Sequence, residues 1–238
     1  MSDDRPLFIL AGNGPYENRG CEAIVRGTVN ILRQHYDNPR FICISHFDSE
    51  RQFKEQINKE CDKDIKHLSS FRLNKRSAIL NFNKPKTWKY IYNILFNKND
   101  LSYSIYSNIL PILPNASAVL SVGGDNYSLS LRNEEPLMIT MLDNLVLDHD
   151  VPLIVWGASV GPFDKKPEYE KYMSQHLRKV TGIFARESAT INYLKSIGVT
   201  DNVRSVADPA FVMEPKKPEG VDDEFSIDGE AIGNSSST

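Results

Sequence analysis

Cysteine is scarce in this chain of 238 residues, which carries only Cys21, Cys43 and Cys61. Three is an odd number, and the spacing of these residues matches no metal-ligand pattern. A disulfide framework and a cysteine metal site are therefore both excluded. Free thiols in a reducing compartment are expected instead.

Long apolar runs are also missing. No stretch approaches the roughly 20 apolar residues that a membrane-spanning helix requires. The first six residues include two acids and no apolar run, so they do not resemble a signal peptide. The sequence has neither a Gly-x-Gly-x-x-Gly motif nor a Walker loop, which nucleotide-binding proteins use to hold phosphates. These absences predict a cytoplasmic protein with no metal and no cofactor.

Acidic residues are nearly absent from residues 66–115, which hold eight Lys or Arg and one acid, Asp100. The whole chain has a formal net charge of −3, so nucleic acid is not an expected partner. Five apolar residues in this basic insert lie on one face of a predicted helix: Trp88, Ile91, Tyr92, Leu95 and Phe96. The insert is a candidate for peripheral contact with a membrane or an anionic lipid-linked acceptor. The alternative is a helix that packs on its lobe and exposes a basic face.

The stretch around which the chain is organised is residues 118–127. Residues 118–122 are small or apolar, as in a strand that is buried on both faces of a parallel sheet. Gly123 and Gly124 follow and let the backbone turn sharply and approach a ligand closely. Asp125 and Asn126 come next. Because ligands of open α/β sheets bind beyond the carboxyl ends of the strands, these two side chains are expected at a binding site.

Similar short apolar segments alternate with helical patterns along the chain. The predicted strands are residues 7–11, 41–45, 118–122, 152–156, 182–185 and 203–206. The predicted helices are residues 21–34, 50–61 and 136–147, one after Pro167, and one that Ser188 caps and Gly198 ends. The alternation predicts an α/β fold with a doubly wound, mainly parallel, Rossmann-like sheet.

The composition changes after residue 213. Residues 214–228 are rich in Pro, Lys and acids, which is typical of a linker, and residues 231–233 resemble the beginning of another strand. We therefore expect one lobe over residues 1–213, with the basic aromatic insert at 66–115. Residues 214–238 are expected to be a linker and the truncated start of a second lobe.

Five sequence blocks resemble, in order, the N-terminal lobe of polysaccharide pyruvyl transferases. They are residues 11–24 (AGNGPYENRGCEAI), 121–125 (SVGGD), 156–162 (WGASVGP), 186–188 (RES) and 208–211 (DPAF). The resemblance covers residues 7–213 apart from the basic insert. It implies a two-lobed fold similar to GT-B glycosyltransferases, of which this chain would be the N-terminal lobe.

The resemblance also implies an activity. Enzymes of this family transfer the pyruvyl group of phosphoenolpyruvate to two sugar hydroxyls as a ketal, in exopolysaccharide biosynthesis. The implied partners are phosphoenolpyruvate and a sugar or lipid-linked glycan acceptor. Because no part of the second lobe is recognisable, this chain alone is expected to be inactive. Two other functions stay open: a GT-B-type glycosyltransferase with a nucleotide-sugar donor, and a non-catalytic fragment or binding module.

Arg186 and Asp125 are the main candidate site residues. The resemblance implies that Arg186 binds substrate, and a guanidinium suits a carboxylate or phosphate; otherwise Arg186 pairs with Glu187 or Asp208. Asp125 is the candidate catalytic base, because ketal formation needs a base for each hydroxyl. Its alternative role is that of an acid that hydrogen-bonds the backbone of its own turn.

Further candidates for substrate binding surround these two: Asn18, Gly20, Gly124, Asn126 and Ser159. Asn18 and Gly20 would present backbone N–H groups at the start of a helix, or Asn18 would be an ordinary helix cap. Ser159 would donate its hydroxyl proton, or would belong to a tight turn. The five histidines are interpreted as surface or packing residues, and only His46 directly follows a strand.

Overall fold

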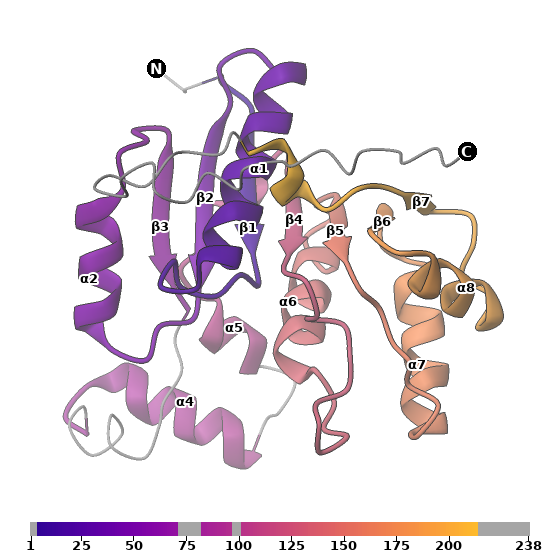
Figure 1. Cartoon of the computed structure of the whole chain (residues 1–238). Helices are drawn as coiled ribbons and strands as arrows, with labels where there is room; N and C mark the ends of the chain where they lie inside the picture. The colour runs from indigo at the N-terminus through magenta and orange to yellow at the C-terminus, as the bar shows by residue number, and fades with distance from the viewer. Residues whose placement is uncertain (1–3, 71–81, 97–100, 214–238) are drawn as a thin grey trace, which may run out of the picture.

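The computed structural model describes residues 4–70, 82–96 and 101–213 (Figure 1). Seven parallel strands form one sheet in the order β3-β2-β1-β4-β5-β6-β7. The strands are β1 (Leu7–Ala11), β2 (Arg40–Ser45), β3 (Ile65–Ser69), β4 (Ala118–Val122), β5 (Leu153–Ala158), β6 (Gly182–Ala185) and β7 (Val203–Ser205). This topology confirms the predicted Rossmann-like, doubly wound α/β fold.

Helices cover both faces of the sheet. They are α1 (Arg19–His35), α2 (Glu50–Lys59), α4 (Pro85–Phe96), α5 (Leu101–Ile105), α6 (Leu137–Leu147), α7 (Pro167–Leu177) and α8 (Ser188–Ser196), with short 3-10 helices η2 (Leu113–Asn115) and η3 (Pro209–Val212). Among the described residues, no helix is both long enough and apolar enough to span a bilayer.

Alternate side chains of β1 enter two separate cores, as the period of a strand requires. Phe8 and Leu10 pack with α1, whereas Leu7 and Ile9 pack on the opposite face with α5, α6, α7 and α8. All five residues of β1 are buried. This two-sided burial explains why the central strands are continuous apolar runs in the sequence.

The point at which the chain reverses its winding direction lies between β1 and β4. Strand β1 pairs with β2 on one side and with β4 on the other, both in parallel. The loops that leave β1 and β4 therefore turn toward opposite faces of the sheet, and the space between them is the usual ligand position in this fold. The sequence stretch 118–127 supplies one of these loops.

Three local predictions were wrong. Strand β3, paired in parallel with β2, was not predicted, because it alternates buried Ile65 and His67 with exposed Lys66. Ser188 is the first residue of α8 rather than its cap. Glu187 occupies the cap position, but its side chain accepts no hydrogen bond from the first N–H groups of the helix. The alternative that α4 packs its apolar face on the lobe is also wrong, because most of these side chains face solvent. The predicted linker at 214–238 lies outside the described residues.

The end of α8 at Gly198 is as predicted. Gly198 has φ +75°, which disfavours other residues, and its N–H donates to the Lys195 carbonyl. The next N–H, of Val199, donates to the Leu194 carbonyl at 2.9 Å. This pair of bonds is the Schellman arrangement.

An ion pair between Arg33 and Asp62 links α1 to the turn before β3 and gives a pH-dependent prediction. Arg33 Nη1 and Nη2 lie 2.7 and 2.9 Å from the two Asp62 carboxylate oxygens. Hydrogen bonding from this guanidinium holds the pKa of Asp62 below its usual range. We expect Arg33→Gln to lower the free energy of unfolding at neutral pH by about 0.5–1 kcal/mol, since solvent screens this partly exposed pair.

The loss should shrink in acid. A lowered folded-state pKa contributes stability above the unfolded pKa of about 3.9, and that stability disappears as pH falls through the folded value. Urea unfolding of both proteins at about pH 7 and about pH 3 measures the difference. Arg51→Gln is the control, because Arg51 pairs with Glu55 on the open surface of α2. An equal loss at both pH values for Arg33→Gln would show that the charge of Asp62 is not involved.

Candidate functional site

Asn126 joins the loops that follow β1 and β4. Its side-chain Nδ2 donates to the Gly12 carbonyl at 2.8 Å and to the Val122 carbonyl at 3.0 Å. A Cβ at Gly123, whose φ is +140°, would lie 2.2 Å from the same nitrogen. Both protons of the Asn126 amide are thus used within the protein, and its oxygen remains as the atom that can accept from a ligand.

Arg186 follows β6 directly and lies against the glycine loop of β4. Its Nη1 donates to Asp208 Oδ2 at 2.7 Å, and its Nε donates to Ser159 Oγ at 3.2 Å. A Cβ at Gly124 would come within 2.8 and 2.9 Å of Nη1 and Nη2, so a side chain at this position would displace the guanidinium from its present place. These two bonds use two of the five N–H groups of arginine. The described residues offer no partner for the other three.

Asp208 is held in place by close contacts of the residue that follows it. The Asp208 carboxylate accepts from the Ala210 N–H at 2.9 Å and so caps η3. A Cβ at Gly27 would lie 1.9 Å from the Pro209 carbonyl oxygen, and one at Gly157 would lie 2.5 Å from Pro209 Cδ. Contacts of α1 and β5 with Pro209 therefore fix the position of the preceding residue, Asp208, which in turn orients Arg186.

Ser159 connects Arg186 to Glu187. Its Oγ accepts from Arg186 Nε and donates to the Glu187 carboxylate. Its backbone N–H donates to the Gly124 carbonyl at 2.8 Å, which ties the loop after β5 to the loop after β4. The Ser159 hydroxyl thus orients the two charged side chains, and Glu187 is bonded to Ser159 instead of Arg186.

Asp125 is exposed at the turn after Gly124. Its main-chain carbonyl accepts from the Ser128 N–H at 3.2 Å, and this bond closes the turn. No described residue bonds its carboxylate. The side chain is therefore not used to form the turn, and it stands one residue away from the glycine on which Arg186 lies.

Asn18 and Gly20 lie at the start of α1, where both are exposed. Asn18 Oδ1 accepts from the Gly20 N–H at 3.0 Å, so Asn18 is the helix cap and that N–H is already bonded. Among the described residues no bond joins either of them to Arg186 or Asp125. The structure thus brings Gly124, Ser159 and Arg186 together, with Asp125 next to them, whereas no bond among the described residues joins Asn18 or Gly20 to this group.

A pocket of about 530 Å³ opens at the carboxyl ends of β1 and β2. Gly12 and the polar residues Asn13, His46, Asn126 and Glu135 line part of it, and most of the remaining lining is apolar side chains of α4, α5 and α6. Asn13 is 3% exposed, and its Nδ2 donates to the Cys21 carbonyl at 3.0 Å. No bond from the described residues reaches Asn13 Oδ1. Asn13 was not among the predicted site residues, although it belongs to the block of residues 11–24 that carries the family resemblance.

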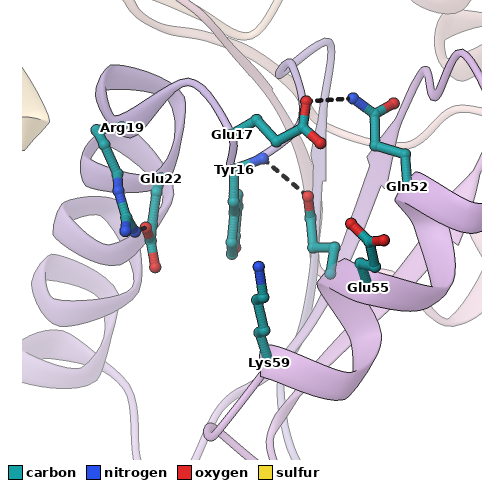
Figure 2. A pocket seen from close by; sticks show the side chains of 8 residues that line it. Tyr16, Glu17, Arg19, Glu22, Gln52, Glu55 and Lys59 are labelled. Carbon is teal, nitrogen blue, oxygen red and sulfur yellow. Dashed lines mark hydrogen bonds and ion pairs between the residues drawn. The ribbon is translucent and has the colours of Figure 1, made fainter.

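A second pocket, of about 240 Å³, lies between the start of α1 and α2 (Figure 2). Its walls bond largely to one another. Gln52 Nε2 donates to Glu17 Oε2 at 2.8 Å, and the Tyr16 N–H donates to Gln56 Oε1 at 2.8 Å. Arg19, which also lines it, pairs with its neighbour on α1. None of the candidate site residues lines this pocket.

A buried network supports the loop that carries Asp125. The Tyr127 hydroxyl donates to the Asp143 carboxylate, at 2.9 Å from each oxygen, and His176 Nε2 lies 3.0 Å from Asp143 Oδ2. Burial raises the pKa of Asp143, and the hydrogen bonds from His176 and Tyr127 oppose this rise. The sequence analysis missed the network because its members are far apart along the chain.

Among the solved structures that resemble this chain are three of low sequence identity. UDP-GlcNAc 2-epimerase from Methanocaldococcus jannaschii is 12% identical, with a TM-score of 0.47, over 85% of this chain and 45% of that protein. The UDP-GlcNAc 2-epimerase from Neisseria meningitidis bound to UDP-GlcNAc is 12% identical, with a TM-score of 0.48, over 87% and 47%. TcCGT1 in complex with UDP is 10% identical, with a TM-score of 0.49, over 90% and 53%. The chain spans about half the length of these proteins.

No curated protein matches the sequence. The family described as polysaccharide pyruvyl transferase matches residues 18–237, which is nearly the whole chain. This range includes the loops that carry Asp125, Ser159 and Arg186. The chain belongs to the polysaccharide pyruvyl transferase family.

Proposed function

We propose that the protein transfers the pyruvyl group of phosphoenolpyruvate to two hydroxyls of a glycan, with release of phosphate. The methylene carbon of the donor gains a proton, and one sugar hydroxyl adds to the neighbouring carbon. The bond from that carbon to the phosphate oxygen breaks, and the second hydroxyl adds to complete the ketal. The two hydroxyls lose two protons in total. The new methyl group gains one proton, and the released phosphate takes up the other.

The observation that carries the proposal is the setting of Arg186. The donor has a carboxylate and a phosphate, and three N–H groups of Arg186 are without a partner among the described residues. Asp208 and Ser159 fix the direction of the guanidinium, so little side-chain freedom would be lost on binding. The close approach at Gly124 gives an anion access to both the guanidinium and the loop backbone.

Asp125 is the proposed base for an attacking hydroxyl. Its carboxylate is exposed and is not bonded by the described residues, and its neighbour Gly124 is in contact with Arg186. A donor on Arg186 and a hydroxyl on Asp125 would therefore meet at one turn. General-base catalysis of this kind contributes roughly 10²- to 10⁴-fold in rate.

The remaining candidates have supporting roles in this proposal. Asn126 Oδ1 would accept from an acceptor hydroxyl, and Ser159 would hold Arg186 and Glu187 in place. Asn18 and Gly20 would contribute the positive end of α1 rather than a free Gly20 N–H. The acceptor is proposed to be a sugar of an exopolysaccharide or of its lipid-linked precursor. Phosphoenolpyruvate is a cytoplasmic metabolite, so the reaction is proposed to take place there.

Because this chain alone is expected to be inactive, the proposed function is tested with a form of the protein that carries both lobes. It is incubated with phosphoenolpyruvate and a panel of galactose- and mannose-containing acceptors. Phosphate release that depends on the acceptor, together with an acceptor mass increase matching a pyruvyl ketal, is the expected result. A parallel incubation with UDP-sugars distinguishes the glycosyltransferase alternative. UDP release in that arm, with no phosphate release from phosphoenolpyruvate, would replace the proposal.

The variant Asp125→Asn should reduce turnover by roughly 10²-fold or more while leaving the melting temperature nearly unchanged. Asparagine keeps the volume of the side chain and is well tolerated in turns, but it cannot accept a proton at neutral pH. Steady-state phosphate release measures the change. Asp37→Asn is the matched control, because Asp37 is an exposed turn acid between α1 and β2. Normal turnover of Asp125→Asn would show that the Asp125 carboxylate is not the base.

A further inference from the structure

Helix α4 buries two polar side chains and exposes most of its large apolar ones. Thr87 and Asn93 are 1% and 3% exposed, although both are polar. In contrast, four large apolar residues at helical spacing are largely exposed: Trp88 at 49%, Tyr92 at 60%, Leu95 at 67% and Phe96 at 73%. A surface helix of a globular protein normally shows the opposite arrangement.

Specific contacts hold α4 in this orientation. Asn93 Nδ2 donates to Ser104 Oγ on α5 at 2.7 Å, so the buried amide has a partner. Tyr90, on the same inner face, is 7% exposed and belongs to the core beneath α5 and α6. Rotating the helix to bury its apolar stripe would break these contacts. The exposed stripe is therefore a property of the folded chain.

The exposed side chains form one surface patch. Of the thirteen large hydrophobic side chains that are exposed in the described part of the chain, six lie within residues 82–96. The rings of Phe82 and Trp88 are 4.6 Å apart between centroids, and those of Tyr92 and Phe96 are 5.1 Å apart. Concentrated apolar surface of this kind marks an interaction site.

The charge around the patch identifies the partner. Residues 82–96 contain three lysines, at 84, 86 and 89, and no acid. Exposed Lys84 and Lys89 accompany Trp88 and Tyr92, which are the residue types that favour the interface between water and lipid headgroups. A second copy of the chain is a poorer fit, because a two-fold contact would place the lysines of one patch against those of the other. We propose that α4 docks the protein on an anionic lipid bilayer.

The position of α4 connects this surface to the proposed reaction. Figure 1 shows α4 beyond the carboxyl ends of the strands, on the side of the sheet where the loops that follow β1 and β4 begin. Its inner residue Tyr90 lines the pocket of about 530 Å³ that reaches Gly12 and Asn126. If the proposed pyruvyl transfer holds, docking through α4 brings this pocket to the membrane surface. The substrate class is then an acceptor glycan on a lipid anchor.

Vesicle co-sedimentation tests the docking and needs no catalysis, so it is independent of the proposed function. The purified chain is mixed at low salt with phosphatidylcholine vesicles that contain or lack phosphatidylglycerol. The wild-type chain should sediment with the anionic vesicles and much less with the neutral ones. Leu95→Glu should weaken this binding roughly tenfold or more. Lys89→Gln should weaken it about fivefold.

Two controls match these variants in chemistry and exposure. Ile57→Glu places a carboxylate at an exposed aliphatic position of α2, and Lys171→Gln removes an exposed lysine of α7. Both should bind anionic vesicles like the wild-type chain, and all variants should keep its far-UV circular dichroism spectrum. Failure of the wild-type chain to bind anionic vesicles would overturn the proposal. So would unchanged binding by Leu95→Glu, or a wild-type dimer that Leu95→Glu dissociates.

Discussion

Replacing Arg186 with alanine should weaken phosphoenolpyruvate binding by roughly 1.5–3 kcal/mol, which is the scale of a hydrogen bond to a charged group. This corresponds to about tenfold to a hundredfold in the dissociation constant. The variant removes the N–H groups proposed to bind the donor, and it leaves the Asp208 carboxylate without its partner at 2.7 Å. An unpaired carboxylate repels an anionic donor, so the loss should lie toward the upper end of this range.

Isothermal titration calorimetry with phosphoenolpyruvate measures the effect. Arg186→Lys should recover only part of the affinity, because lysine lacks the planar fork that bonds Asp208, Ser159 and an anion together. The matched control is Arg204→Ala on β7, since Arg204 is exposed and its partners in the described part of the chain are the carbonyls of Asp201 and Val203. A melting temperature lowered by Arg186→Ala with unchanged donor affinity would reduce Arg186 to a structural partner of Asp208.

The central strands were predictable because a parallel strand covered on both faces has no polar side. Residues 118–122 were predicted as a strand, and β4 has these bounds. Strand β3 lies at the edge of the sheet and exposes Lys66, so its sequence resembles a charged loop. The sequence therefore predicts strands that are buried on both faces better than it predicts strands at the edge of the sheet.

The approximate place of the site was predictable for a similar reason. The carboxyl ends of neighbouring parallel strands meet at one edge, so residues after β4, β5 and β6 converge there. Arg186 contacts Gly124 and Ser159 although up to 62 positions separate them in the sequence. The hydrogen-bond partners were not predictable, because they depend on loop conformations. The Asn126 amide bonded to Gly12 is an example. The cap formed by Asn18, in contrast, was one of the two alternatives that the sequence analysis gave.

The orientation of α4 could not be predicted, for a different reason. Helical periodicity identified the stripe from Trp88 to Phe96, but it does not state whether the stripe faces the core. The inner face of α4 is set by Asn93, whose partner Ser104 lies on another helix. Periodicity within one helix carries no information about a partner on another helix, so the inward face of α4 could not be read from the sequence.

The buried Asp143 should have the largest effect on stability. We expect Asp143→Ala to lower the free energy of unfolding by roughly 3–5 kcal/mol. This is the usual loss when one partner of a buried ion pair is removed. Asp143 is 0% exposed and His176 is 2% exposed, so water cannot replace the lost carboxylate. The Tyr127 hydroxyl would also lose its acceptor, and the smaller alanine would leave a cavity between α6 and α7.

Urea unfolding monitored by circular dichroism measures this loss, and a graded series keeps the result interpretable if the alanine variant does not fold. Tyr127→Phe removes only the hydroxyl and should cost roughly 1–2 kcal/mol. Asp143→Asn should fall between the two, since one amide oxygen cannot accept from both Tyr127 and His176 as well as a carboxylate does. Asp148→Ala, at the exposed end of α6, is the control. A loss below about 1 kcal/mol for Asp143→Ala would mean that the network does not stabilise the loop that carries Asp125.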